Sequence, residues 1–198
     1  MLIKNLCSLI IPPIVLFLLT KRPTVSVLFL ALLFTVYSPD KSKQIYNPNI
    51  VYCPSSGKIM NISIDSNNNI ARIAIFLNIY NNHTQYMPID STAVEINRIH
   101  GPNFPAYTLK SSHNEQLVTL LYNQNKDMYY KIYQMTGIIA RRLKTMLKIN
   151  HSYTSGDRLG FIFLGSRVDI EVPLNKIKKI LIRNKQIMSS MEPIILLN

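Results

Sequence analysis

From Tyr46 onward the chain is made of short runs rich in β-branched residues, and each run is followed by Asn, Gly, Ser or Pro. Short runs of this kind, bounded by turn-forming residues, predict β-strands. The predicted strands span residues 50–53, 58–64, 70–77, 94–99, 116–122 and 129–135. Regular short strands with turns between them are typical of a β-barrel or a β-sandwich. The sequence therefore predicts a mainly β domain.

The rest of the domain adds two less regular features. Residues 136–144 predict a short helix with basic residues on its polar side. Residues 147–160 and 180–193 share a faint similarity, a strand followed by a polar turn and a small-acidic pair. Such a repeat predicts two β-hairpins packed as in lipoyl-type folded sandwiches, with the segment around Ser166 between them. We therefore expect a β-barrel/sandwich-hybrid fold with few short helices.

The first forty residues have a different composition, with a dense apolar block and almost no charge. Two apolar runs, residues 6–20 and 24–37, are separated by Lys-Arg-Pro at 21–23. Each run is shorter than the ~20 residues that a perpendicular helix needs to cross a bilayer. Two arrangements remain open: a re-entrant or interfacial helical hairpin, or one tilted and kinked span. Either one makes residues 1–40 a hydrophobic, helical membrane-attachment segment that precedes the β domain of residues 41–198.

The chain is also strongly basic. Lys and Arg number 22 against 10 acidic residues, which gives a net charge of +12. Such a charge favours an anionic partner, either nucleic acid or an acidic bilayer. The apolar leader favours the bilayer, and no aromatic-basic motif of the kind that binds single strands is present. We expect a membrane-associated protein that binds no nucleic acid. The histidines lack metal-ligand spacing, so no metal site is expected.

Gly165 and Ser166 follow the hydrophobic run of residues 160–164. Because glycine has no Cβ, its carbonyl is unhindered and the residue tolerates turn geometry. Backbone self-cleavage at a serine would need such a bond, although a Gly-Ser turn between two strands explains the same residues. A serine nucleophile also needs a base. His83, at the end of an apolar strand, is a candidate, and a histidine in such a place can equally be structural.

Three segments carry a resemblance to a known family. Residues 160–173 read GFIFLGSRVDIEVP, residues 134–142 read QMTGIIARR, and residues 76–88 read FLNIYNNHTQYMP. They are similar to the signatures G-x-I-x-F-G-S-R-V-D-x-x-x-P, Q-I-A-G-x-x-A-R-R and F-M-S-P-x-D-V-H-V-N-R-x-P of the short (type II) class of phosphatidylserine decarboxylases. Because the agreement runs over nearly the whole chain, it is more specific than any single motif.

The resemblance implies that the chain cuts itself between Gly165 and Ser166, into a β chain of residues 1–165 and an α chain of residues 166–198. Ser166 would attack the Gly165 carbonyl with His83 as the base, and the resulting ester would be converted into a pyruvoyl group at the new N-terminus. In the family this group is the electron sink for decarboxylation of phosphatidylserine to phosphatidylethanolamine and carbon dioxide.

The resemblance also suggests how the substrate is held. Arg141, Arg142 and Arg167 are candidates for contacting its phosphate or carboxylate, and a solvated basic face is the alternative for each of them. The expected partners are phosphatidylserine and an anionic membrane surface, and a homodimer is one assembly that we consider. The apolar leader would keep the active site at the bilayer, where the net charge attracts an acidic leaflet.

The chain departs from the family at two acidic positions. Ser56 stands where the family has the aspartate of S-P-A-D-G, and Asn81 where it has the aspartate of D-V-H. Loss of the carboxylate that orients a triad histidine costs on the order of 10⁴ in rate. Asp90 and Asp169 are candidates to replace it beside His83. Three hypotheses follow: a pyruvoyl-dependent decarboxylase, a related protein that cleaves slowly or not at all and only binds lipid, and an unrelated membrane-anchored β domain.

Overall fold

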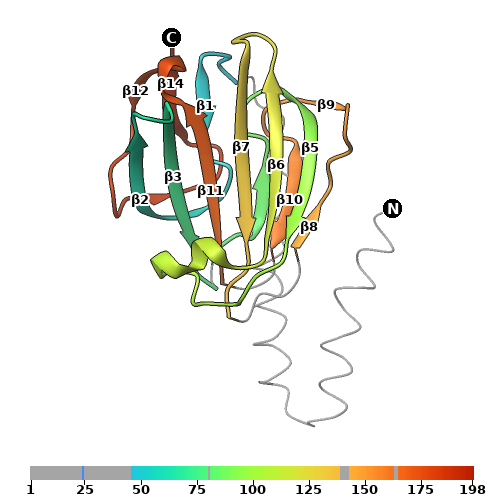
Figure 1. Cartoon of the computed structure of the whole chain (residues 1–198), viewed down its shortest axis with the longest axis vertical. Helices are drawn as coiled ribbons and strands as arrows, with labels where there is room; N and C mark the ends of the chain where they lie inside the picture. The colour runs from blue at the N-terminus through green and yellow to red at the C-terminus, as the bar shows by residue number, and fades with distance from the viewer. Residues whose placement is uncertain (1–23, 25–45, 80, 139–142, 163–164) are drawn as a thin grey trace. The chain divides into compact units, whose positions relative to one another are not determined.

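The computed structural model describes residue 24 and residues 46–79, 81–138, 143–162 and 165–198. Within these residues the chain forms a domain of antiparallel strands with two short 3₁₀ helices (Figure 1). The elements are, in chain order, β1 (Ile50–Tyr52), β2 (Gly57–Asp65), β3 (Ile70–Leu77), β4 (Thr84–Tyr86), β5 (Ser91–Ile99), η1 (Leu109–His113), β6 (Gln116–Asn123), β7 (Met128–Met135), β8 (Leu143–Thr145), β9 (Ser152–Tyr153), β10 (Arg158–Ile162), β11 (Ser166–Pro173), η2 (Leu174–Lys176), β12 (Ile177–Ile180), β13 (Ile187–Met188) and β14 (Pro193–Leu197).

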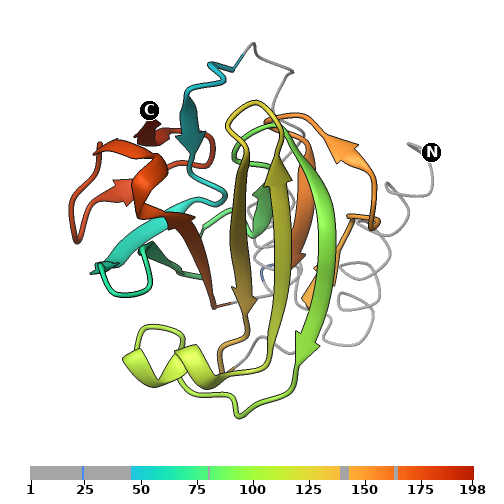
Figure 2. The same cartoon turned by 45° about the horizontal axis from the view of Figure 1, so that its top comes forward.

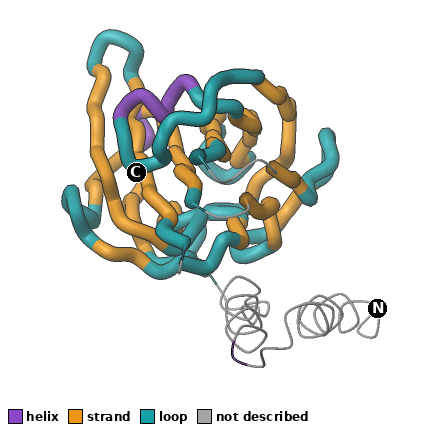
Figure 3. The backbone as a smooth tube through the Cα atoms, turned by 90° about the horizontal axis from the view of Figure 1, so that it is seen from below, coloured by secondary structure: helices purple, strands orange, loops and turns teal. Residues whose placement is uncertain are grey.

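Eight of the described strands form one sheet in the order β13-β2-β3-β11-β7-β6-β5-β9, and the others form two three-stranded sheets, β1-β14-β12 and β4-β10-β8. Figure 2 shows β5, β6 and β7 in front of β10, and in the view from below strands lie on both sides of the domain (Figure 3). Side chains from all three sheets share one hydrophobic core, among them Ile75 of β3, Leu159 of β10 and Ile195 of β14.

Strand β11 lies in the interior of the large sheet, between β3 and β7. Its residues 166–172 are all buried. Val168, Ile170 and Val172 point into the core and are fully buried, while charged residues alternate with them on the other face. By contrast, β6 alternates strictly between buried and half-buried residues, as expected of a strand with only one face in the core. The first residue of β11, Ser166, is therefore held inside the domain.

The prediction of a mainly β domain is confirmed. The six predicted strands correspond to β1, β2, β3, β5, β6 and β7, with ends that agree within three residues. The described strands do not close into a barrel, because they form three separate sheets. The strands of the two small sheets are short, and among the described residues none of them pairs with a strand of the large sheet.

One prediction of local structure is wrong, that of a helix over residues 136–144. Residues 136–138 are not helical, and the end of the predicted helix is strand β8. Strand β8 pairs with β10, and this tertiary pairing overrides the local helix propensity. Residues 147–160 and 180–193 each connect two strands that pair antiparallel with each other, because β8 pairs with β10 and β12 pairs with β14. The short strand inside each connection pairs instead with the large sheet, β9 with β5 and β13 with β2. The two segments therefore share one arrangement, as their faint similarity predicts.

Some predictions fall on parts of the chain that the structure does not describe. The attachment segment of residues 1–40 lies outside the described residues except for Thr24, and so do Arg141 and Arg142. Among the helices that are described, none is both long and apolar enough to span a bilayer. The membrane-attachment segment and the substrate-binding roles of Arg141 and Arg142 stay predictions.

Candidate active site

The register of the large sheet brings the Gly165–Ser166 bond close to His83. Ser166, the first residue of β11, pairs with Leu77, the last residue of β3. The chain leaves β3 at that point and reaches His83 six residues later, directly before β4. In Figure 1 this is the lower end of the domain, where β3 and β7 end and β11 begins. Two segments far apart in the sequence therefore meet at one end of the sheet.

His83 is almost completely buried and uses both ring nitrogens. Its Nδ1 lies 2.6 Å from the backbone carbonyl oxygen of Asn81, and its Nε2 accepts a hydrogen bond of 3.2 Å from the N–H of Gly165. A neutral imidazole satisfies both contacts when Nδ1 carries the proton, because a carbonyl only accepts and an N–H only donates. The lone pair of Nε2 therefore faces the Gly165–Ser166 segment.

Burial lowers the pKa of His83 below its ordinary value, and the hydrogen bond to the Asn81 carbonyl opposes this shift in part. Desolvation disfavours the charged imidazolium, whereas an acceptor on Nδ1 favours it. Because burial is the larger effect, His83 is neutral at pH 7. A neutral histidine with an unprotonated Nε2 is able to act as a general base.

A chain of buried amides fixes the backbone of His83. Gln85 donates to the His83 carbonyl oxygen at 2.6 Å, and Gln134 donates to the side-chain oxygen of Gln85 at 2.9 Å. The N–H of Ile162 donates to the same His83 carbonyl. Gln85 and Gln134 have no solvent exposure. These groups position the histidine from the neighbouring strands β4, β7 and β10.

The hydroxyl of Ser166 has no hydrogen-bond partner among the described residues, and the residue is fully buried. A buried hydroxyl without a partner costs about 1–3 kcal/mol. Unpartnered buried groups of this kind are exceptional in folded proteins and call for an explanation, of which a catalytic role is one. In this state Nε2 of His83 is engaged with the N–H of Gly165, the residue before the serine, rather than with the hydroxyl.

Gly165 adopts a backbone conformation that favours glycine. Its φ angle is +63°, and an added Cβ would meet no atom within 4 Å. The left-handed conformation costs a residue with a side chain roughly 1–2 kcal/mol. The position therefore selects glycine through its torsion angle and not through lack of space.

Neither Ser56, which stands at the position of the family aspartate, nor the two candidates to replace that aspartate, Asp90 and Asp169, is a hydrogen-bond partner of His83. The hydroxyl of Ser56 accepts from the backbone N–H of Ser190 at 2.9 Å. Asp90 accepts from the backbone N–H of Ser155, and Asp169 is paired with Arg167. The acceptor for Nδ1 is instead the main-chain carbonyl of Asn81. Sequence reasoning missed it because every residue has a carbonyl.

Arg167 lies in a buried ion pair. Its guanidinium donates two hydrogen bonds of 2.7 Å to the two carboxylate oxygens of Asp169, and a third of 3.1 Å to the hydroxyl of Ser111 in η1. Burial raises the pKa of Asp169, while Arg167 opposes that shift. With its guanidinium held in this way, Arg167 has a structural position under η1. This geometry does not favour the substrate contact that we expected of it.

Gly137 is a site residue that sequence reasoning passed over. A Cβ added to it would lie 2.2 Å from the carbonyl oxygen of Gly165. Gly137 belongs to the QMTG segment that resembles the family signature, and that resemblance was the only signal in the sequence. Among the described residues no group of His, Cys, Asp and Glu side chains is arranged to hold a metal ion.

The family model described as phosphatidylserine decarboxylase matches residues 30–195. The chain therefore belongs to the phosphatidylserine decarboxylase family, whose members are carboxy-lyases. It is 30% identical over 148 residues to a phosphatidylserine decarboxylase proenzyme of Burkholderia multivorans, which covers 72% of this chain and 69% of that protein. A proenzyme of the same name from Burkholderia ambifaria is 29% identical over 147 residues, with the same coverage.

A more distant relative comes from Methanococcoides burtonii. This protein, provisionally named an archaetidylserine decarboxylase proenzyme, is 27% identical over 135 residues, which cover 68% of this chain and 61% of that protein. The names of these relatives differ in the lipid, phosphatidylserine or archaetidylserine, and agree on its decarboxylation. All three relatives are named as proenzymes.

Proposed function

We propose that this chain is a proenzyme that cuts itself between Gly165 and Ser166 and then decarboxylates phosphatidylserine to phosphatidylethanolamine and carbon dioxide. One observation carries the proposal. The unprotonated Nε2 of buried His83 lies against the N–H of Gly165, next to a buried Ser166 hydroxyl that has no partner. A nucleophile, a base and a bond to cut thus lie together in a water-poor site.

The nucleophile, the base and the bond that is cut all belong to this chain, and water enters only at the last step. His83 takes the proton from the Ser166 hydroxyl, and the hydroxyl oxygen forms a bond to the Gly165 carbonyl carbon. The carbon–nitrogen bond between the two residues then breaks, and the proton passes to the released nitrogen, which leaves an ester. Loss of the Cα proton of Ser166 expels the Gly165 carboxylate. Water then replaces the nitrogen, which leaves as ammonia, and the three carbons of the serine remain as a pyruvoyl group.

The residues present fit such a group. Ser166 supplies its carbons from the buried start of β11, and no side chain fills the space beside Gly165. Once formed, a pyruvoyl group supplies an electron sink for decarboxylation. The role of the surrounding chain is to hold this position at the end of β11, to exclude water from it, and to keep the neutral His83 within reach as a proton carrier.

The alternative of a related protein that cleaves slowly or not at all gains no support from the relatives, which are named proenzymes. The Asn81 carbonyl also takes over part of the role of the missing aspartate, because it fixes the tautomer and the orientation of the His83 ring. A carbonyl lacks the full negative charge that stabilises an imidazolium. We therefore expect self-cleavage that is slower than in relatives with the aspartate.

The test is the mass of the purified chain over time. The wild type should split into two fragments, the smaller one beginning with a pyruvoyl-blocked residue 166. Ser166→Ala and His83→Ala should remain at the intact mass of 22.7 kDa. Ser56→Ala is the matched control and should cleave at the wild-type rate, because Ser56 bonds Ser190 and not His83. A wild-type chain that stays whole would rule out the proposed function.

A membrane contact at the same end of the domain extends the proposal. Four of the exposed apolar side chains lie in the segments that adjoin the Gly165–Ser166 bond: Phe104, Tyr107, Leu109 and Ile138. Tyr107 packs edge-on against Phe76, one residue before the β3 residue that pairs with Ser166. Since a substrate with two acyl chains must be reached at a bilayer surface, we propose that these side chains enter an anionic bilayer.

This contact is tested with Tyr107→Ser combined with Leu109→Ser. Burial of each of these side chains in lipid is worth about 1.5–3 kcal/mol, so the variant should turn over phosphatidylserine in vesicles at least about tenfold more slowly. Its self-cleavage and its turnover of phosphatidylserine in detergent should be unchanged. Ile64→Ser with Tyr129→Ser removes two exposed apolar side chains elsewhere and is the control. Equal rates of both variants on vesicles would contradict the contact.

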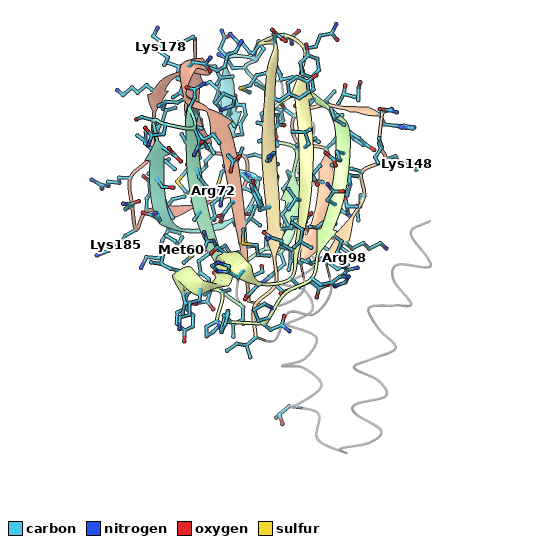
Figure 4. The ribbon with its side chains drawn as sticks, viewed as in Figure 1. Met60, Arg72, Arg98, Lys148, Lys178 and Lys185 are labelled. Carbon is cyan, nitrogen blue, oxygen red and sulfur yellow. The ribbon has the colours of Figure 1, made fainter. Side chains whose placement is uncertain are left out.

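The roles of Arg141 and Arg142 in holding the headgroup, and a homodimer, stay predictions of the sequence. Figure 4 shows Lys148, Lys178 and Lys185 pointing outward from different sides of the domain. The positive charge is therefore spread around the domain. It would draw the whole protein toward an anionic leaflet, while the apolar side chains near Ser166 would decide which end meets the lipid.

A further inference from the structure

We infer that Gly137 is a positioning residue for self-cleavage, which fixes the place of the Gly165 carbonyl oxygen by lying directly against it. The inference rests on the proposed cleavage between Gly165 and Ser166. It concerns a residue that makes no bond to the reacting atoms and acts only through the carbonyl beside it.

The two glycines are needed for different physical reasons. A Cβ on Gly137 would lie 2.2 Å from the carbonyl oxygen of Gly165 and 3.2 Å from its carbonyl carbon. No side chain fits at such distances, so Gly137 is selected by lack of space. A Cβ on Gly165 would meet nothing within 4 Å, and that residue is selected by its φ of +63°. Gly137 therefore lies directly against the carbonyl of the bond that is cut.

Hydrogen bonds from a neighbouring loop fix Thr136, the residue before Gly137. The side-chain amide of Asn114 donates to the Thr136 carbonyl at 2.7 Å, and the backbone N–H of Thr136 donates to the Glu115 carbonyl at 3.0 Å. The Thr136 hydroxyl donates to Asn103 at 3.0 Å. Asn114 has no solvent exposure. The residue before Gly137 is thus anchored through both its backbone and its side chain.

Ala106 lies close to Gly137 on another side. The Cβ of Ala106 would lie 3.1 Å from a Cβ on Gly137, and Ala106 is itself buried. Gly137 is therefore enclosed between Ala106 and the Gly165 carbonyl. It cannot move away to make room for a side chain unless the loop that contains Ala106 also moves.

The position of the carbonyl oxygen matters for the chemistry. When the Ser166 oxygen attacks, the planar carbonyl becomes tetrahedral and negative charge develops on its oxygen. Attack requires the nucleophile to be close to the carbon in the correct direction, and a misplacement of about 1 Å can cost 10²-fold in rate. By limiting where the oxygen can lie, Gly137 keeps the carbonyl presented to Ser166.

The experiment compares Gly137→Ala with Gly57→Ala in the full chain, by the rate at which the intact mass disappears. Gly57 is a matched control, because its Cβ would lie 2.4 Å from another carbonyl oxygen, that of Phe76. Gly137→Ala should cleave about 100-fold more slowly. Gly57→Ala should cleave at the wild-type rate. The pH dependence of the remaining cleavage should be unchanged in Gly137→Ala, because His83 is not altered.

A second pair of variants keeps the inference open to test if Gly137→Ala does not fold. Thr136→Val removes the hydroxyl that bonds Asn103 and the Glu115 carbonyl, without adding bulk, and should slow cleavage. Thr136→Ser keeps the hydroxyl and should cleave as the wild type does. If the wild type cleaves and Gly137→Ala cleaves at the same rate, the inference is overturned and the proposed function stays intact. If Gly137→Ala is unfolded, an unchanged rate in Thr136→Val has the same meaning. A wild type that never cleaves would overturn the proposed function itself.

Discussion

The imidazole of His83 is oriented by a neutral partner. The Asn81 carbonyl fixes the proton on Nδ1, but it offers only a partial charge to the imidazolium that forms when Nε2 takes a proton. Burial adds a second penalty for that charged form. Burial therefore keeps the resting histidine neutral, and the Asn81 carbonyl opposes this effect less than a carboxylate would, so that His83 is a weaker base than a histidine paired with an aspartate. For the proposed self-cleavage, which each molecule would perform once, we expect such a base to be sufficient.

The lowered pKa of His83 predicts how self-cleavage depends on pH. Because the neutral form is the active base, the rate should stay constant as pH falls through the ordinary histidine value of about 6.5 and decline only below it. Unfolded His83 gains its proton first, so this residue also contributes a loss of stability as pH falls from the unfolded pKa to the lower folded one.

Timed mass measurements between pH 5 and pH 8 on freshly refolded chain would give the midpoint of this profile. Asn81→Ala is the control, since it keeps the backbone carbonyl and should keep the midpoint. A midpoint above the ordinary histidine value would contradict the desolvation argument.

The ion pair of Arg167 and Asp169 leads to a prediction about stability. Arg167→Ala leaves a fully buried carboxylate unpaired, which typically costs about 3–5 kcal/mol. Replacing both partners by apolar residues, Arg167→Met with Asp169→Leu, should cost far less. Urea unfolding of each variant in the Ser166→Ala background, where the chain stays whole, would measure the difference. Equal losses in the single and double variants would show that the pairing is not what matters.

Single residues differed in how well the sequence revealed them. The sequence could name Gly165, Ser166 and His83 as candidates, because the role proposed for each depends on its side chain or, in glycine, on the lack of one. The acceptor on Asn81 and the contact of Gly137 with Gly165 could not, because both are main-chain approaches that only the folded chain creates. Arg167 was a candidate for contacting the substrate, and its side-chain pairing with Asp169, two residues away on the same face of β11, became visible only in the folded strand.

The loop from β5 to β6, which contains η1, is hydrogen-bonded to the segment that precedes Gly137. Asn114 lies at its end and makes three hydrogen bonds: it donates to the carbonyls of Phe104 and Thr136 and accepts from the N–H of Phe104. One buried side chain thus joins the two ends of the loop to the segment that precedes Gly137. The loop and the cleavage site should therefore respond together to changes at this residue.

Asn114→Ala should lower the free energy of unfolding by roughly 2–4 kcal/mol, since each net hydrogen bond contributes about 0.5–1.5 kcal/mol and buried partners are left unmade. It should also slow self-cleavage, because the segment before Gly137 loses its anchor. Thermal unfolding and timed mass spectra report the two effects separately. Asn97→Ala, which alters an exposed residue of β5 bonded to Glu95, should change neither. If the Asn114→Ala chain is destabilised but cleaves at the full rate, the loop does not influence the cleavage site.

Strands were predictable where a pattern of six or more residues could develop, as in β3, β6 and β7. The three-residue strands β4 and β8 are too short for any periodicity and exist because β10 pairs with both of them. The order of strands in the sheet also could not be predicted from the sequence. The pairing of β3 with β11 joins Leu77 to Ser166, and nothing local specifies a contact across that many residues. This pairing is the one that builds the site.

The domain as a whole should survive its own cleavage. The part after the cut, residues 166–198, contains β11 and β14. Strand β11 pairs with β3 and β7, and β14 pairs with β1 and β12. Three of these four neighbours belong to the part before the cut. The two fragments therefore share the core and both the large sheet and one small sheet.

Cleaved protein should accordingly run as one species in size-exclusion chromatography under native conditions and separate into two fragments only in denaturant. Alanine at Ile170, which is fully buried in β11, should cost about 2–5 kcal/mol and let the fragments part at lower urea. The Ser166→Ala chain, which is never cut, is the control for the native particle size. Fragments that separate without denaturant would show that β11 is held less firmly than its pairing suggests.

The interior place of β11 also makes maturation a one-way event for folding. Before the cut, β11 finds β3 and β7 within one chain, in a reaction whose rate does not depend on concentration. After the cut, the unfolded pieces must meet as two molecules, so their recovery depends on protein concentration and pays the entropy of association. A mature molecule that unfolds at high dilution is therefore lost, whereas an uncut one can refold. Slow cleavage at Gly165 would then give each new chain time to complete its fold before it gives up the ability to repeat it.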